Sequence, residues 1–385
     1  MQNQSHWKAF LAGIFLLLVT GIAVAQTGDQ ADPQAQAAAP AVELTAAEVA
    51  AIRGGDRAAV RAILRRTGVN LEDPEQIRLA VSNLIRVSVS GLDAAGAVSI
   101  LELVSSTVTA AVVEASAEAG ADVASAAESA SAAASESVVE VAVSLGADPG
   151  AAVELVSRGV VRGNSEVTLA ADVNRDGLVG ERDREEGVAR TARGSAEGGV
   201  IASTRVGIDS RVIAARASAG SASGAVEVAA VTGQSVREVV RSAARGSVQG
   251  VSRAATFSGG TVSRDEVVRA ASAGATEGSV TASAAIGQDA NEAASGASSG
   301  AVSAAVEEAS AAGEDTAAAA SAASAGAGEG AVRGSETASL DVATVSQAAQ
   351  AGSVEGAIEA AAATGEDAQS LTESATAGAI AGTGG

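Results

Sequence analysis

Small apolar and polar residues fill long stretches of this chain, and breaks containing glycine interrupt them at a regular spacing. In each break a Gly is followed two residues later by an Asp or Ser, as at Gly120 and Asp122, and again 26 residues later at Gly146 and Asp148. The equivalent cap position recurs, with some imperfect copies, at Asp209, Ser235, Ser263, Asp289, Asp315, Asp341 and Asp367. A fixed spacing of this kind indicates tandem repeats.

The breaks predict helix ends. Gly tolerates the left-handed conformation that closes a helix, and Asp or Ser then caps the next one. The stretches between caps are rich in Ala, the best helix former, and would form helices of about 22 residues, roughly 33 Å long. Connections of about three residues make neighbours antiparallel. We therefore expect an all-α fold, an array of antiparallel helices with a 26-residue repeat, either α-solenoid-like or layered. Whether the array is flat, superhelical or closed stays open.

A second regularity lies inside these stretches. Small residues, usually both Gly, stand eleven and fifteen residues after each cap position. The pairs are Gly159/Gly163, Gly194/Gly198, Gly220/Gly224, Gly246/Gly250, Gly274/Gly278, Gly300/Ala304, Gly326/Gly330, Gly352/Gly356 and Gly378/Gly382. A Gly inside a helix costs about 1 kcal/mol relative to Ala, so the pairs need a compensating gain. Because each pair lies on one face, we expect neighbouring backbones to touch at these glycines.

The chain divides into four predicted parts. Residues 1–25 resemble a secretory signal, with Lys8 before an apolar stretch and a cleavage pattern ending near Ala25. Residues 26–43 read as a linker. Residues 44–119, with a capping box from Thr45 to Glu48 and more Val, Ile and Leu, would form an N-terminal helical cap. Residues 120–385 hold the repeats. A retained N-terminal anchor is the alternative to a cleaved signal; with cleavage, the protein is secreted, periplasmic or at the cell surface.

Composition argues against an enzyme. Once residues 1–25 are removed, the chain contains no His, Cys, Lys, Tyr or Trp. General acid–base and nucleophilic catalysis usually depend on His, Cys or Lys. Aromatic residues, which commonly line ligand pockets, are 1% of the chain. We therefore expect a structural protein.

Charge and hydropathy limit the partners. The net charge of −21 disfavours nucleic acid. Charged residues such as Glu329 and Arg333 within the repeats make a membrane-spanning segment in the mature chain unfavourable, although paired small residues also occur in membrane helices. A protein partner, a cell surface or a second copy of the chain fits an array with repeated faces.

One motif carries specific chemistry, at residues 172–183. Acidic and amide side chains occupy loop positions 1, 3 and 5, a Gly occupies position 6, and an Asp closes position 12. The candidate calcium ligands are Asp172, Asn174, Asp176, the backbone carbonyl of Leu178, and Asp183. Calcium takes six to eight oxygen ligands, and this spacing places such oxygens around one point. The repeat register makes the loop an expanded turn with Asp183 at the next cap position. An Asp/Asn/Gly turn that binds nothing is the alternative.

The loop resembles the EF-hand family over 12 of 385 residues, and its start is most similar to dockerin loops. It departs from typical EF-hands in having Asp183, not Glu, at its end, and we find one copy where dockerins have two. The resemblance implies calcium binding. We expect an exported calcium-binding scaffold; the alternative is a dockerin-like, calcium-dependent interaction module of polysaccharide-degrading assemblies.

Overall fold

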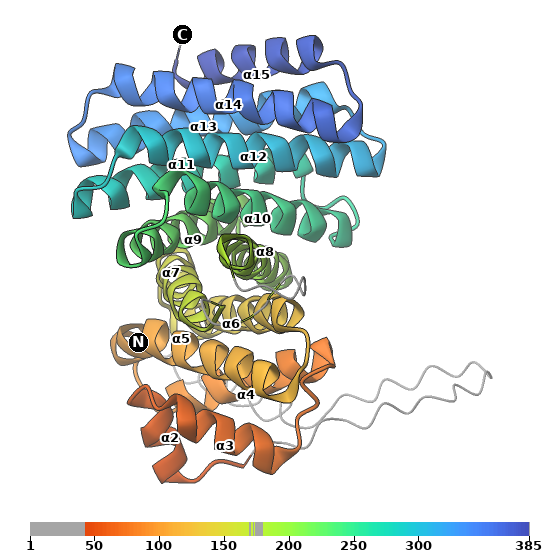
Figure 1. The fold of residues 1–385 in the computed structure, drawn as a ribbon. Helices are drawn as coiled ribbons and strands as arrows, with labels where there is room; N and C mark the ends of the chain where they lie inside the picture. Colours follow the sequence, from red (N-terminus) through yellow and green to blue (C-terminus); the bar gives the residue numbers. More distant parts are fainter. Residues whose placement is uncertain (1–42, 169–170, 172, 174–179, 385) are drawn as a thin grey trace, which may run out of the picture. The chain divides into compact units, whose positions relative to one another are not determined.

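The computed structural model describes residues 43–168, 171, 173 and 180–384, and within them the protein is all helical (Figure 1). Four helices precede the repeats: α2 (Ala46–Arg53), α3 (Arg57–Thr67), α4 (Pro74–Val89) and α5 (Ala94–Ala119). Ten follow: α6 (Val123–Leu145), α7 (Pro149–Thr168), α8 (Glu181–Val206), α9 (Ser210–Thr232), α10 (Val236–Phe257), α11 (Arg264–Ile286), α12 (Ala290–Ala312), α13 (Thr316–Ala338), α14 (Val342–Thr364) and α15 (Ala368–Gly382). The predicted all-α array with its 26-residue repeat is confirmed.

The predicted helix ends and caps are also present in the structure. After α6, Gly146 adopts φ 69°, a left-handed conformation that few other residues tolerate. At the start of α12, the Asp289 side chain accepts a hydrogen bond of 2.8 Å from the backbone N–H of Asn291. Ser339 closes α13 at φ 58° and is the single non-glycine residue with positive φ in the described part of the chain. Helix ends are therefore set by local chemistry that the sequence displays.

The helices of the repeats form two layers. Helices two apart in the chain pack side by side, so that α6, α8, α10, α12 and α14 make one layer while α5, α7, α9, α11, α13 and α15 make the other (Figure 1). Consecutive helices join the layers and run antiparallel. Helices within a layer therefore run in the same direction.

The glycine pairs hold each layer together. A Cβ atom placed on Gly246 of α10 would overlap the carbonyl oxygen of Ala189 in α8, and one on Gly250 would overlap that of Arg193. The expectation that backbones touch at the glycines is correct, but the two sides of the contact differ. From Gly194/Gly198 onward, the Gly pair of one helix meets the carbonyls six and ten residues after the cap position of the helix two before. Each helix needs one face for the preceding neighbour and another for the following one, so two Gly pairs do not face each other.

The core changes character along the chain. The largest fully buried side chains of the N-terminal helices include Ile63, Leu84 and Leu101. In the later helices the core consists mainly of Ala and Val with buried Ser, and some of the hydroxyls, such as that of Ser298, donate to a carbonyl one turn earlier, here Ala294 at 2.8 Å. Small side chains and close backbones replace large apolar groups there.

Helix α5 is the one described helix that is long and apolar enough to cross a membrane. Within its most apolar window, 67% of the residues are buried among the other helices. A core helix shows this degree of burial.

Candidate functional site

The predicted calcium loop connects two helices of the array. Helix α7 ends at Thr168 and α8 begins at Glu181, so the loop replaces a turn that elsewhere takes about three residues. Asp172, Asn174, Asp176 and Leu178 lie outside the described residues. Val173 is 4% exposed and packs in a small cluster with Val113 of α5 and Val123 of α6. The loop is therefore attached to the core at its second position.

Asp183 is the predicted ligand that the structure describes. It lies in the first turn of α8 and is 1% exposed, the one buried carboxylate among the described residues. Its Oδ2 accepts a hydrogen bond of 2.8 Å from the backbone N–H of Gly180. The prediction that Asp183 caps the helix was wrong, because Gly180 begins α8 three residues earlier. Positions in α8 are still counted from Asp183, which keeps the 26-residue register. The carboxylate is thereby directed back toward the start of the helix, beside the loop.

The described residues contain no cluster of three or more Asp, Glu or His side chains that could hold a metal. Four of the five predicted ligands fall outside that part of the chain. The loop itself therefore stays a prediction.

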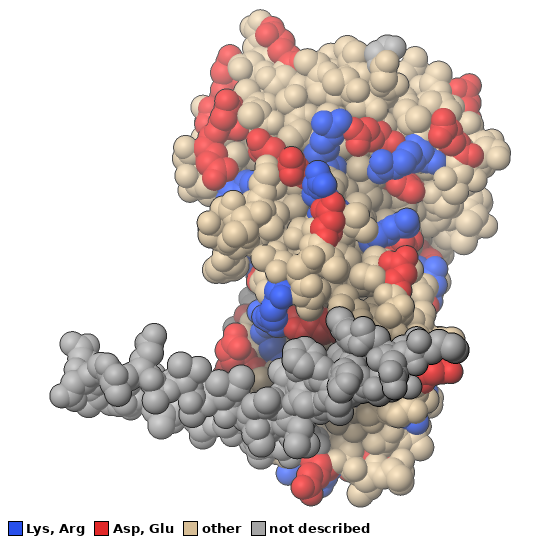
Figure 2. Space-filling view, turned by 180° about the vertical axis from the view of Figure 1, so that it is seen from behind, with Lys and Arg blue, Asp and Glu red and all other residues tan. Residues whose placement is uncertain are grey.

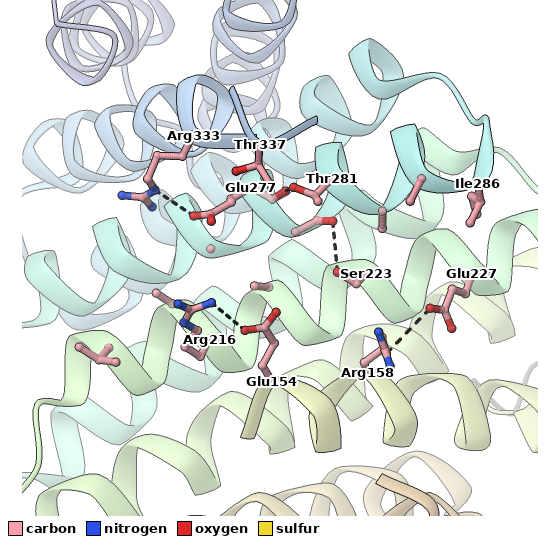
Figure 3. Close-up of a pocket in the computed structure, with 17 residues that line it drawn as sticks. Glu154, Arg158, Arg216, Ser223, Glu227, Glu277, Thr281, Ile286, Arg333 and Thr337 are labelled. Carbon is pink, nitrogen blue, oxygen red and sulfur yellow. Dashed lines mark hydrogen bonds and ion pairs between the residues drawn. The ribbon is translucent and has the colours of Figure 1, made fainter. Parts of the chain in front are cut away.

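A groove of about 700 Å³ lies along α9 and α11 (Figure 3). Its floor consists of small residues from both helices: Ala215, Ala219, Gly274 and Gly278. Its charged side chains are joined as ion pairs: Glu154 with Arg216 at 2.9 Å, Arg158 with Glu227 at 3.9 Å, and Glu277 with Arg333 at 2.9 Å. The charged residues that line the groove are therefore already paired with each other and would not be free to bind a charged ligand.

Ion pairs of this kind extend across the layers. Figure 2 shows acidic and basic side chains next to each other on one face of the protein. In the other layer, Glu128 of α6 accepts from three arginines: Arg190 at 3.0 Å, Arg193 at 3.5 Å and Arg253 at 3.0 Å. Arg193 is 8% exposed and also donates to the side chain of Gln249. These arginines come from two helices, and the sequence offers no signal that they share one carboxylate.

Glu197 of α8 lies in the same charged cluster. Burial is the main cause that raises its pKa, and the nearby charge of Glu128 raises it further, while Arg78, Arg253 and Arg193 lower it less. A carboxyl whose pKa is raised on folding binds its proton more tightly in the folded state. The contribution of Glu197 to stability is therefore greatest at low pH and is lost as pH rises through the folded pKa.

We expect Glu197→Gln to raise the melting temperature at pH 7 by roughly 1–3 °C, since it removes a partly buried charge while keeping the shape. The gain should shrink as pH falls to 4, because wild-type Glu197 is then protonated. Thermal melts from pH 4 to 8 test this, with Glu336→Gln on the exposed surface of α13 as the control. A gain that is the same at pH 4 and pH 7 contradicts the assignment.

Comparisons with known proteins place the chain in no family. No protein-family profile and no curated protein sequence matches it. A solved structure described as a "Circular tandem repeat protein with novel repeat topology and enhanced subunit contact surfaces" is similar to it at 15% identity. The match covers 87% of this chain and 81% of that one, with a TM-score of 0.26.

Proposed function

We propose that this protein is an exported, non-catalytic scaffold in which calcium bound at residues 172–183 fixes the turn between α7 and α8. The observation that carries the proposal is the buried Asp183 carboxylate at the end of an acidic loop, between two packed helices. Asp183 stands at loop position 12, where EF-hand-type loops supply a carboxylate to calcium. The composition of the mature chain and of residues 1–25 supports the absence of catalysis and the export.

Calcium would have a structural purpose at this place. A long connection inside a tight array costs conformational entropy each time the neighbouring helices pack. Asp172, Asn174, Asp176 and Asp183, together with the carbonyl of Leu178, would hold the ion and so order the turn. The two parts of the array would then stay in register. The array faces would remain available to a protein or cell-surface partner.

We expect 1 mM calcium to raise the melting temperature of the full chain, with a stabilisation of about 2.7 kcal/mol where the concentration is 100 times the Kd. Asp172→Ala should abolish this shift. Circular dichroism melts in calcium and in chelator measure it. Magnesium should give a smaller shift, because it prefers six ligands in a tighter octahedral shell.

The matched control is Asp289→Ala, which removes a helix cap far from the loop along the chain. It should lower stability by about 1 kcal/mol and leave the calcium shift intact. Titration calorimetry without binding heat at millimolar calcium, together with an unchanged melt, would rule out a functional loop.

A further inference from the structure

Two large apolar side chains are half exposed on the last two helices. Ile358 of α14 is 51% exposed and Ile380 of α15 is 50% exposed. Single exposed apolar residues are ordinary on protein surfaces. These two differ because the repeat shows what normally happens at their positions.

Ile358 stands seventeen residues after its cap position, Asp341. In α8, α9, α11 and α12 the residues at the same place are Val200, Val226, Val280 and Val306, and each is 0% exposed. In α13, whose following neighbour α15 has 15 residues, Val332 is partly buried. Val280 shows what covers this position: a Cβ on Gly334, in the helix two later, would lie 3.0 Å from its Cβ. Position seventeen is therefore buried by the next helix of the same layer.

Ile380 stands thirteen residues after its cap position, Asp367. Val248 and Val302 occupy the same place in interior helices and are 0% exposed. At this position of α7, Val161 lies 3.2 Å from the place where Gly224 of α9 would carry a Cβ. Position thirteen is thus also covered by the helix two later. In the part of the chain that the structure describes, Ile358 and Ile380 have no such cover and are half exposed.

The surrounding surface suits apolar contact. Positions six and ten after the cap, which receive the next Gly pair elsewhere, are exposed in both helices. We call these six residues the terminal face: Gln347, Ala351, Ile358, Glu373, Ala377 and Ile380. It carries one charge. Helices of 23 and 15 residues lying side by side present roughly 600 Å² per copy, or about 1,200 Å² in a pair, which reaches the range of specific interfaces.

We propose that the terminal face binds the terminal face of a second copy of this chain, giving a two-fold symmetric dimer. The repeated packing argues for this arrangement over a head-to-tail chain. A head-to-tail neighbour would have to offer a vacant Gly pair, but the pairs from Gly194/Gly198 onward already meet carbonyls of their own chain. A face that meets its own copy closes at two subunits.

Sedimentation of the full chain from 1 to 100 µM should show a dimer, in calcium and in chelator alike. Ile358→Asp should weaken the dimer at least about 100-fold, because it places a charge in the centre of the contact. Val231→Asp is the matched control, since Val231 is 88% exposed on α9 and outside the terminal face. Both variants should keep the wild-type melting temperature of the monomer.

The chain contains no cysteine, so a single introduced one reports geometry cleanly. A thiol reagent should react more slowly with Ala351→Cys in the dimer than in the monomer, and equally fast with Val231→Cys in both. A monomer at 100 µM, or a dimer that Ile358→Asp leaves intact, would overturn the proposal. Because neither readout depends on calcium, failure here is distinguishable from failure of the proposed function.

Discussion

Replacing Gly274 with alanine should lower the free energy of unfolding by about 3 kcal/mol or more. A Cβ on Gly274 of α11 would overlap the carbonyl oxygen of Ala215 in α9, and backbone cannot move aside as a side chain can. Helix propensity alone predicts the opposite sign, a gain of about 1 kcal/mol for Gly→Ala inside a helix. Urea denaturation followed by circular dichroism measures the difference.

The control is the same substitution where only side chains are near. A Cβ on Gly150 of α7 would meet Asp148 Oδ1 at 3.2 Å, Arg216 Cγ at 3.3 Å and Val212 Cγ1 at 3.5 Å. These side-chain atoms can shift, so the free energy of unfolding of Gly150→Ala should stay within about 1 kcal/mol of the wild type. Equal effects at Gly150 and Gly274 would show that the glycines do not set the helix spacing.

One helix shows how the array accommodates an alanine at a paired position. Helix α12 has Ala304 fifteen residues after its cap position, where most helices have Gly, and Ala304 is 0% exposed. Its close contacts are instead at Gly296 and Gly300, against the carbonyls of Arg237 and Arg241 in α10. The contact has moved one turn toward the start of the helix. In α12, two glycines one turn apart are therefore kept although the repeat is imperfect.

The sequence predicted most helix ends because capping is local. Asp122 begins α6 and Asp289 begins α12 as expected, since each side chain acts on backbone N–H groups two or three residues away. It did not predict which helices touch. Ala and Ser cover nearly every face of the repeats, so no apolar stripe distinguishes the side that meets the helix two before from the side that meets the next helix.

In the candidate sites, too, the sequence predicts features set by neighbouring residues but not contacts between residues far apart in the chain. The spacing within residues 172–183 is visible in the sequence, but the burial of Asp183 depends on the packing of α8 and is not. Glu128 and Arg253 are separated by 125 residues and joined by a bond of 3.0 Å. The packing of α6, α8 and α10 side by side in one layer brings them together, and neither residue stands out among the charged residues of the chain.

In the N-terminal helices, where large side chains form the core, we expect a substitution to destabilise the protein by leaving a cavity, not by making backbones overlap. Leu101 of α5 is 1% exposed and packs in one apolar cluster with residues of α3 and α4, among them Ile63 and Leu84. Leu101→Ala should lower stability by about 2–5 kcal/mol, since it leaves a cavity that this packing cannot fill. Leu103→Ala, on the same helix but 48% exposed, should lower it by about 1 kcal/mol or less.

The destabilisation caused by Leu101→Ala should also be confined to the N-terminal helices. In a repeat array each helix is stabilised mainly by its neighbours, so damage at one end spreads weakly to the other. Hydrogen exchange should show faster exchange in α2 to α5 while amides of α11 to α14 keep their protection. Uniformly faster exchange along the chain would mean that the apolar N-terminal helices and the glycine-packed layers unfold as one cooperative unit.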